Sequence, residues 1–465
     1  MMENEVCINP PTLCDGYNLV PFGICVYSTT NIFSLKGTCY KKGEKICLLF
    51  QDDFEFVTDF FSILTDQKTK EDEGYSFIIH SFREYNETIK VNIEKFIKKY
   101  ITNENIKTLQ VFINKLTLGE HIAIFELGKI KNSLEEVKVI QCLRKQNHEK
   151  YIEDIDQIVQ LHSYDVKMYG TERKKIGCKN KSQRVCRWCN KGVKDGAFFK
   201  EDAHAISESL GNKNLILYDE CDSCNGYFGS EIEPSLINLF LPFTVMNGVK
   251  GKKHIPHIAN KICRNKENKI YDDIFRMTYE EERNISIKIF NNEVIEQNGK
   301  LKFNFNIPGK VIEQNIYKTL CKYALSLIEK EEILSQYQET IEWLRNYIFW
   351  DKVPVVKSAL VYAFYKKYPE LLIYTKKEEN SDFPDMFAEF HYLGFVWIYI
   401  VPKNRKEAAY FSDINNFTKF WENTIYVKTT LEWSEREYSN TISRKLKYNF
   451  SFEPRLKLQT TKDLK

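Results

Sequence analysis

The sequence contains no long apolar run. Nowhere do about 18 apolar residues follow one another, the length that a helix needs to span a bilayer. The first residues, MMENEVCINPPTLC, also lack the basic flank and apolar stretch of a secretory leader. We therefore expect a protein that has no membrane contact, is not secreted and is located in the cytoplasm.

A strong net charge is missing as well, since 67 Lys and Arg against 64 Asp and Glu leave +3. The charge is unevenly distributed, however. The segment 167–200 has eleven basic residues and only two acidic ones, and a second basic run, VKGKKHIPHIANKICRNK, covers 249–266. One basic cluster alone is usually a solvated surface, but two clusters around one segment favour a polyanion such as nucleic acid. The predicted nucleic-acid contacts are Lys174, Lys175, Arg184, Arg187, Lys252 and Lys253.

Internal repeats and low-complexity tracts are absent, so domains must be separated by pattern. A chain of 465 residues exceeds one hydrophobic core, and we expect an α+β protein in three parts. These are an N-terminal α+β domain (1–145), a central core (146–245) and a C-terminal α+β accessory domain (246–465). Apolar spacing predicts a helix over 149–170, a hairpin around 297–299, two amphipathic helices within 314–349 and an apolar hairpin over 386–402.

Cysteine is neither rare nor evenly used. The chain has 13 cysteines, an odd number, and most are scattered singly, which is typical of free thiols in a reducing compartment. Four stand in two Cys-x-x-Cys pairs, Cys186 with Cys189 and Cys221 with Cys224. Four thiolates favour zinc, and a closed set of four is structural because it leaves no position for a substrate. We predict a structural Zn²⁺ at these residues.

A single histidine, His204, lies between the two pairs. A lone histidine on an apolar strand is usually a packed core residue. Here it stands among polar residues (Asp202, Glu208, Asn212 and Asn214) and precedes an aliphatic strand, Leu215 to Leu217. Asn225 directly follows the last cysteine. A polar setting of this kind favours chemistry over packing.

The ordered set of Cys186, Cys189, His204, SLGNKNL and CDSCN resembles the HNH nuclease family. The resemblance is to the branch whose ββα-metal core is stapled by zinc-binding cysteine pairs, and it covers a small fraction of the chain. It implies a hairpin that carries His204, a loop, and a helix that starts near Asp222. It also implies three catalytic roles: a general base for His204, a loop-holding role for Asn214, with Asn212 close enough to be confused with it, and a divalent-ion ligand for Asn225.

One position departs from the family pattern. Many members have Asp, Glu or His immediately before the base histidine as a further ion ligand, and this chain has Ala203. Asp202 is the nearest carboxylate, but neighbouring strand residues point to opposite faces. Four further carboxylates are candidates, so the ligand set stays open: Glu220, Asp222, Glu231 and Glu233.

The sequence therefore predicts a metal-dependent endonuclease that hydrolyses double-stranded DNA. Mg²⁺ or Mn²⁺ is the expected catalytic ion, with Ni²⁺ as a further candidate. An inactive zinc-stapled nucleic-acid-binding module and an RNA-cleaving nuclease are the alternatives. The flanking regions are expected to set target choice or to bind an activating partner or a second copy of the chain. Defence against foreign DNA, including antiphage defence, is a context suggested by analogy alone.

Overall fold

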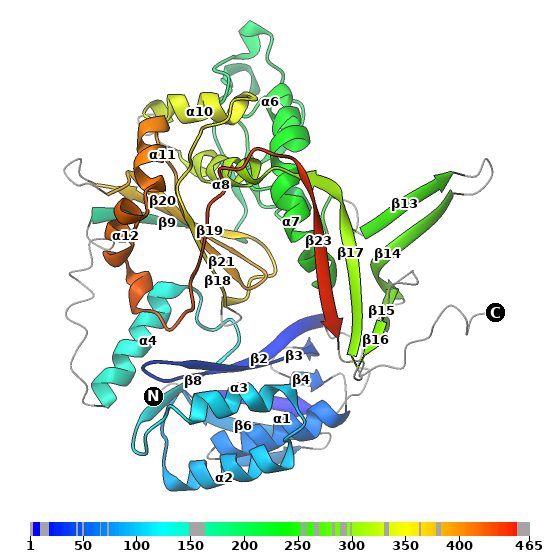
Figure 1. Cartoon of the computed structure of the whole chain (residues 1–465), viewed down its shortest axis with the longest axis vertical. Helices are drawn as coiled ribbons and strands as arrows, with labels where there is room; N and C mark the ends of the chain where they lie inside the picture. The colour runs from blue at the N-terminus through cyan, green and yellow to red at the C-terminus, as the bar shows by residue number, and fades with distance from the viewer. Residues whose placement is uncertain are drawn as a thin grey trace.

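The computed structural model describes sixteen stretches of the chain, and the statements below concern these alone. They are residues 3–9, 18–42, 45–48, 51–65, 67–71, 74–147, 163–252, 256, 258–264, 269–280, 284–288, 295–297, 300–329, 334–361, 364–377 and 383–452. The architecture is mixed α+β, as predicted (Figure 1). Within the described ranges, every helix is too short or too polar to cross a bilayer.

The N-terminal part is an eight-stranded sheet covered on one face by helices α1 (Gln51–Leu64), α2 (Glu87–Lys99) and α3 (Glu104–Ile113) (Figure 1). The spatial strand order is β5-β6-β1-β4-β3-β2-β8-β7. In chain order the strands are β1 (Glu3–Asn9), β2 (Asn18–Tyr27), β3 (Ile32–Lys42), β4 (Lys45–Leu48), β5 (Gln67–Glu71), β6 (Gly74–His80), β7 (Phe82–Glu84) and β8 (His121–Glu126).

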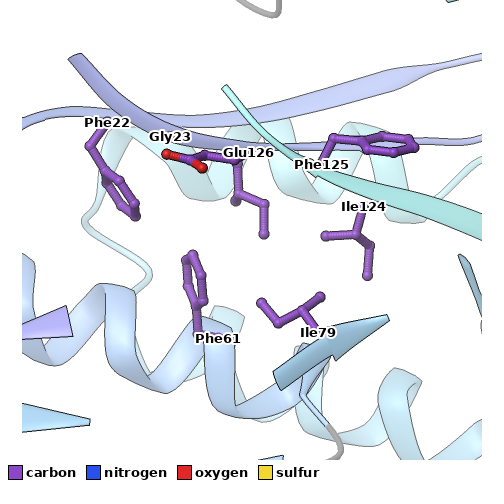
Figure 2. A pocket seen from close by; sticks show the side chains of 8 residues that line it. Phe22, Gly23, Phe61, Ile79, Ile124, Phe125 and Glu126 are labelled. Atoms are coloured by element: carbon purple, nitrogen blue, oxygen red, sulfur yellow. The ribbon is translucent and has the colours of Figure 1, made fainter. Parts of the chain in front are cut away.

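A small apolar cavity lies between this sheet and α1 (Figure 2). Phe22 from β2, Phe61 from α1 and Ile79 from β6 point into it. Its volume of about 20 Å³ admits nothing larger than a water molecule. The cavity is therefore a packing defect of the sheet-helix interface and no ligand site.

A six-stranded sheet lies in the middle of the molecule, with the order β22-β18-β21-β20-β19-β9. Its strands are β9 (Tyr164–Tyr169), β18 (Val356–Leu360), β19 (Glu370–Lys376), β20 (Met386–Tyr392), β21 (Phe395–Ile400) and β22 (Ser434–Arg436). Alternate residues of β21 enter two different cores, so this strand is buried on both faces. The Trp397 and Tyr399 side chains lie in one of these cores.

Helices cover both faces of the six-stranded sheet. On one face, α4 (Ser133–Gln146), α11 (Arg405–Ser412), α12 (Ile414–Glu422) and the short helix η7 (Ile425–Lys428) share a core with one face of the N-terminal sheet. On the other face lie α7 (Glu233–Met246), α8 (Glu313–Leu327) and α10 (Gln338–Arg345). Both cores therefore draw residues from more than one of the three predicted domains.

Helix α8 is buried along its whole length, from Glu313 to Leu327. The sequence pattern is amphipathic, and a polar face ordinarily meets water. In this fold, the polar side chains Gln314, Lys318 and Lys322, four residues apart, point into protein and bind protein partners. The helix is thus a central element and not a surface one.

Two further three-stranded sheets lie at one side of the molecule (Figure 1). One has the order β13-β14-β15, with β13 (Ile258–Arg264), β14 (Lys269–Glu280) and β15 (Asn284–Lys288). The other has the order β16-β17-β23, with β16 (Ile295–Gln297), β17 (Lys300–Val311) and β23 (Arg444–Phe452).

Both predicted hairpins are confirmed, as are the two helices within 314–349. Strand β16 pairs with β17 from Gln297 opposite Lys300, and β20 pairs with β21 across a turn at Leu393 and Gly394. The helix predicted over 149–170 is wrong at 164–169, because that segment pairs with β19 along its whole length. Pairing with a distant strand outweighs the local helical spacing here. Residues 149–162 of this prediction lie outside the described residues.

One buried carboxyl group at the junction of the N- and C-terminal regions makes the stability depend on pH. Glu136 of α4 is fully buried and accepts a hydrogen bond of 2.6 Å from the Thr430 hydroxyl. Burial raises the pKa of Glu136 from its usual 4.5 to about 7. The folded protein therefore binds more protons than the unfolded chain between these values, and its stability falls as the pH rises through this window.

Replacing Glu136 with Gln should remove this dependence. We expect the Tm of Glu136→Gln, measured relative to wild type, to rise by a few degrees between pH 5 and pH 8, because the variant has no buried carboxyl to ionise. Thermal unfolding at both pH values measures this. A difference in Tm that stays constant with pH would contradict the assignment.

Candidate functional site

The segment between the cysteine pairs folds as two short antiparallel strands followed by a helix. Strand β11 (Ala203–His204) pairs with β12 (Leu215–Leu217), with Ala203 opposite Leu217 and His204 opposite Ile216. Helix α6 (Asp222–Tyr227) follows β12. Strand β10 (Lys174–Ile176) adds a parallel third strand on the other side of β12. The predicted hairpin and the helix start at Asp222 are therefore both present.

The four paired cysteines meet at one point. Their Sγ atoms all lie within 4.8 Å of one another, and Cys189 Sγ is 3.7 Å from Cys221 Sγ. A tetrahedral zinc with Zn–S bonds of about 2.3 Å holds its sulfur atoms about 3.8 Å apart. The backbone N–H of Cys221 also donates to Cys186 Sγ at 3.4 Å. The cluster thus fits a structural zinc.

The crowded thiols share their protons. Hydrogen bonding to the Cys221 sulfur raises the pKa of the Cys186 thiol to about 12. Hydrogen bonds to Cys186 and Cys221 raise the pKa of the Cys224 thiol as well. Four thiolates at these separations repel one another without a cation between them. A divalent ion bound among the four sulfur atoms replaces these protons and removes the repulsion. The arrangement of the four cysteines therefore favours a bound metal ion.

His204 lies on the hairpin with its ring half-buried. Burial lowers the pKa of this imidazole, which therefore stays neutral at neutral pH and can accept a proton. Its neighbour Ala203 is 1% exposed and faces the core, so a carboxylate at that position would be buried.

The zinc-type cluster, the histidine hairpin and the following helix coincide with a known family. Residues 176–241 match the family model described as HNH endonuclease. This segment is an HNH domain. Among curated proteins and solved structures, none matches the chain. The match covers a small part of the sequence, so it identifies the central segment and leaves the flanking regions unassigned.

The loop of the HNH domain is held by Asn212 in this structure. Its side chain is 4% exposed, and its Nδ2 donates to the Ile206 carbonyl at 2.7 Å. Its Oδ1 accepts from the backbone N–H groups of Asn214 and Leu215, at 3.2 and 3.3 Å. Asn214 instead donates its Nδ2 to the Thr171 carbonyl at 2.5 Å. Asn212 therefore makes the contacts that hold this loop, and the role expected of Asn214 stays a prediction.

Asn225 projects from α6 toward the residues that lead into β11. Its Nδ2 donates to Glu201 Oε2 at 3.3 Å. The Asp222 carboxylate accepts from the backbone N–H groups of Lys200 and Glu201, at 2.9 and 3.1 Å, and so fixes the backbone of the Glu201 segment. Asp202 is exposed, and its charge acts on His204. The sequence analysis overlooked Glu201, although it stands next to Asp202 in the same polar run.

Two of the other candidate carboxylates are occupied by a buried lysine. Lys322 of α8 lies 3.0 Å from Glu233 Oε1 and 3.5 Å from Glu220 Oε2, and all three side chains are almost fully buried. Burial lowers the pKa of Lys322, but the two carboxylates more than compensate and leave it raised, so the lysine is charged. Glu220 and Glu233 therefore hold a lysine inside the protein and do not face an external ion.

Two residues predicted to contact nucleic acid are buried and bound to partners within the protein. Arg184 is 5% exposed, and its Nε donates to the Cys178 carbonyl at 2.9 Å. The Arg187 side chain is 4% exposed and forms a bidentate pair with Asp219, at 3.1 and 2.8 Å. Both guanidinium groups are used to hold the cysteine segment, because a carbonyl or carboxylate partner is available inside the fold. Sequence charge alone does not distinguish this use from phosphate binding.

The other predicted basic contacts have more varied positions. Lys175 and Lys252 are exposed, and Lys253 lies outside the described residues. Lys174 is half-buried and pairs with Glu329. An open groove is lined by Arg173, Lys174, Lys175 and Lys179, at the edge of the HNH domain. This groove offers a basic surface to a polyanion.

Replacing Cys221 with Ser tests the zinc cluster. The variant should lose bound zinc and unfold the HNH domain, because binding energy at such sites is folding energy. Exposed Cys178 supplies a control, since its thiol lies outside the cluster. Zinc content by atomic absorption and thermal unfolding of Cys221→Ser and Cys178→Ser provide the comparison. A Cys221→Ser protein with normal zinc and normal Tm would rule out the assignment.

The two asparagines of the loop should differ in their cost to stability. Asn212→Ala leaves the buried Ile206 carbonyl and two N–H groups without their partner, and we expect a loss of about 1–3 kcal/mol. Asn214→Ala removes a contact to the exposed residue Thr171 and should cost less than about 1 kcal/mol. Urea unfolding of the two variants decides between them, and equal losses would contradict the distinction.

Proposed function

We propose that the protein is a metal-dependent endonuclease that hydrolyses phosphodiester bonds in double-stranded DNA. The observation that carries this proposal is the match of residues 176–241 to the HNH endonuclease family, around a neutral histidine and a four-cysteine cluster. In this proposal His204 is the general base, Asn225 is a ligand of the catalytic ion, and the zinc is structural.

His204 takes the proton of the attacking water in the proposed reaction. The new P–O bond forms to the water oxygen, the bond from phosphorus to the 3′-oxygen breaks, and that oxygen leaves with a proton from solvent. The products carry 5′-phosphate and 3′-hydroxyl ends. A base that stays neutral at neutral pH suits this step, and burial keeps His204 in that state.

The residues around Asn225 fit a hard divalent ion. Mg²⁺ and Mn²⁺ prefer oxygen ligands, and the Asn225 amide lies beside the Glu201 carboxylate. Many HNH nucleases have a further ion ligand at the position of Ala203. Glu201 is, besides Asp202, a carboxylate that replaces this ligand in the proposal. When bound, the ion supplies charge neutralisation on the phosphate and on the departing oxygen.

The groove of Arg173, Lys174, Lys175 and Lys179 supports nucleic acid as the substrate. Phosphates of DNA and RNA look alike to Lys and Arg, so the preference for DNA rests on the family. The cysteines that the structure describes are free thiols, which suits a reducing cytoplasm. Within this proposal, the flanking regions recognise the target, an activator or a second copy of the chain, and the reaction restricts foreign DNA.

A second function is favoured by Ala203. Because alanine has no ligating atom, the site lacks a ligand that many HNH nucleases place there. If neither Glu201 nor Asp202 replaces that ligand, the protein is a zinc-stapled module that binds nucleic acid without cutting it. Such a module binds in EDTA and loses affinity steeply with salt.

The test is plasmid cleavage by the full-length wild type and His204→Ala in EDTA, Mg²⁺, Mn²⁺ and Ni²⁺. We expect cleavage by wild type only with a divalent ion, and a rate about a hundredfold or more lower in His204→Ala, because general-base catalysis is lost. His121→Ala, which changes a half-buried histidine of the N-terminal sheet, is the control and should cleave as wild type does.

Three results would change this proposal. Binding without cleavage by folded, zinc-loaded wild type in every metal would favour the binding module. Cleavage that persists in His204→Ala would remove the proposed base. Cleavage of single-stranded or structured RNA in preference to the plasmid would instead replace the substrate class.

A further inference from the structure

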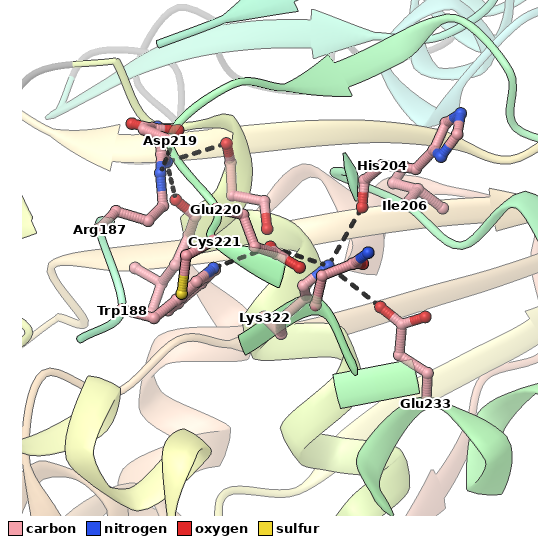
Figure 3. Close-up of polar contacts among 12 residues, drawn as sticks. Arg187, Trp188, His204, Ile206, Asp219, Glu220, Cys221, Glu233 and Lys322 are labelled. Atoms are coloured by element: carbon pink, nitrogen blue, oxygen red, sulfur yellow. Dashed lines mark hydrogen bonds and ion pairs between the residues drawn. The ribbon is translucent and has the colours of Figure 1, made fainter. Parts of the chain in front are cut away.

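Lys322 reaches the backbone of the proposed catalytic base from outside the HNH domain. Its Nζ lies 3.1 Å from the carbonyl oxygen of His204, 118 positions away in the sequence. Figure 3 shows the carbonyl of His204 pointing toward Lys322 and the imidazole pointing away from it. The lysine therefore contacts the base without occupying the site of chemistry.

The ammonium group joins three separate segments of the HNH domain. Besides His204 on β11, it contacts Glu220, which precedes the zinc-type ligand Cys221, and Glu233, which begins α7. The three donors of an ammonium group are thus matched to three acceptors (Figure 3). A buried charge with fewer partners would cost several kcal/mol, so this geometry is strongly constrained.

The same network touches the other half of the cysteine cluster. Trp188, which lies between Cys186 and Cys189, donates its Nε1 to Glu220 Oε2 at 2.8 Å. Glu220 thus connects Lys322 to both cysteine pairs. The position of β11 and the position of the cluster are set by one buried group of side chains.

A second contact fixes the end of α8 against the domain. Arg187 Nη1 donates to the carbonyls of Leu325, Ser326 and Ile328, at 2.7 to 3.0 Å. These are carbonyls that the end of a helix leaves without an internal partner. Helix α8 is consequently held by the HNH domain at its centre and at its C-terminal end.

Strand β11 is an edge strand of its three-stranded sheet and has two positions of register to β12. The Ala205 N–H donates to the Leu215 carbonyl on β12 at 2.9 Å, whereas the His204 carbonyl accepts from Lys322. We propose that Lys322 is a positioning residue that fixes the backbone of His204, so that α8 of the C-terminal region completes the active site of the HNH domain. The proposal rests on the nuclease function proposed above.

Lys318, one turn away on the same helix, provides a matched control. It is equally buried, and its Nζ likewise has three oxygen partners, which here are the backbone carbonyls of Trp343, Asn346 and Ile348. These acceptors all belong to the C-terminal region. Loss of either lysine should cost stability, but only the loss of Lys322 should affect the base.

The main test variant replaces Lys322 with Met and both carboxylates, Glu220 and Glu233, with Gln, so that no charge is left buried without a partner. Lys318→Met is the control, and Lys322→Arg tests whether a cationic donor restores the contact. Each full-length protein is measured for zinc content, Tm, DNA affinity in EDTA, single-turnover cleavage with saturating Mg²⁺, and hydrogen exchange of the peptides that cover 200–217.

We expect the Lys322 triple variant to retain zinc and DNA affinity, to cleave about tenfold to a hundredfold more slowly, and to exchange faster around β11. Lys318→Met should cleave at the wild-type rate and show unchanged exchange there. Lys322→Arg should recover most of the cleavage rate. A triple variant with wild-type cleavage, or with unchanged exchange around β11, would overturn the proposal. Wild-type protein that cleaves nothing overturns the nuclease function instead, and the exchange comparison still decides whether Lys322 anchors β11.

Discussion

The structure depends on a helix whose polar side chains are buried on every side. Because water cannot reach them, Gln314, Lys318 and Lys322 of α8 must each find protein partners, and they lie four residues apart along one stripe. Gln314 binds the segment around Trp350, Lys318 binds the end of α10, and Lys322 binds the HNH domain. Because each of these buried side chains needs a hydrogen-bond partner, three parts of the chain are fixed around α8.

The residues that hold the candidate site together are distinct from the proposed catalytic residues. The cysteine cluster and the charges around Lys322 are buried and satisfied internally, and they meet at Glu220 and Trp188. Glu201 is exposed, whereas His204 and Asn225 are only partly buried, so these side chains can meet a substrate. A rigid interior with a partly exposed working edge is what hydrolysis needs, since the base has to be placed and water has to reach it.

The sequence predicts those features that local chemistry determines. The spacing of Cys186, Cys189, Cys221 and Cys224 is sufficient for the cluster, and an apolar run interrupted at Leu393 and Gly394 is sufficient for the hairpin of β20 and β21. It does not distinguish Asn212 from Asn214, because both are small amides in one loop and only the folded backbone shows which one is enclosed. The same holds for Arg184 and Arg187, whose buried partners lie outside the local pattern.

Long-range contacts account for the remaining differences. At 164–169 the expected helix gives way to strand β9 because β19, some 200 positions later in the chain, offers it an edge to pair with. The amphipathic sequence pattern places Lys322 on the polar face of a surface helix. In the fold, however, α8 is buried along its whole length. No spacing rule connects Lys322 with His204, so the contact between these two residues is visible only in the fold.

In the proposed nuclease, a structural and a catalytic metal site lie in one HNH domain. Anomalous diffraction from zinc-loaded crystals soaked in MnCl₂, recorded at the zinc and manganese absorption edges, distinguishes the two sites. We expect zinc among the four cysteines and manganese at the oxygen ligands near Asn225 and Glu201. Manganese found only at the cysteines, or absent near Asn225 at saturating concentration, would contradict the proposal.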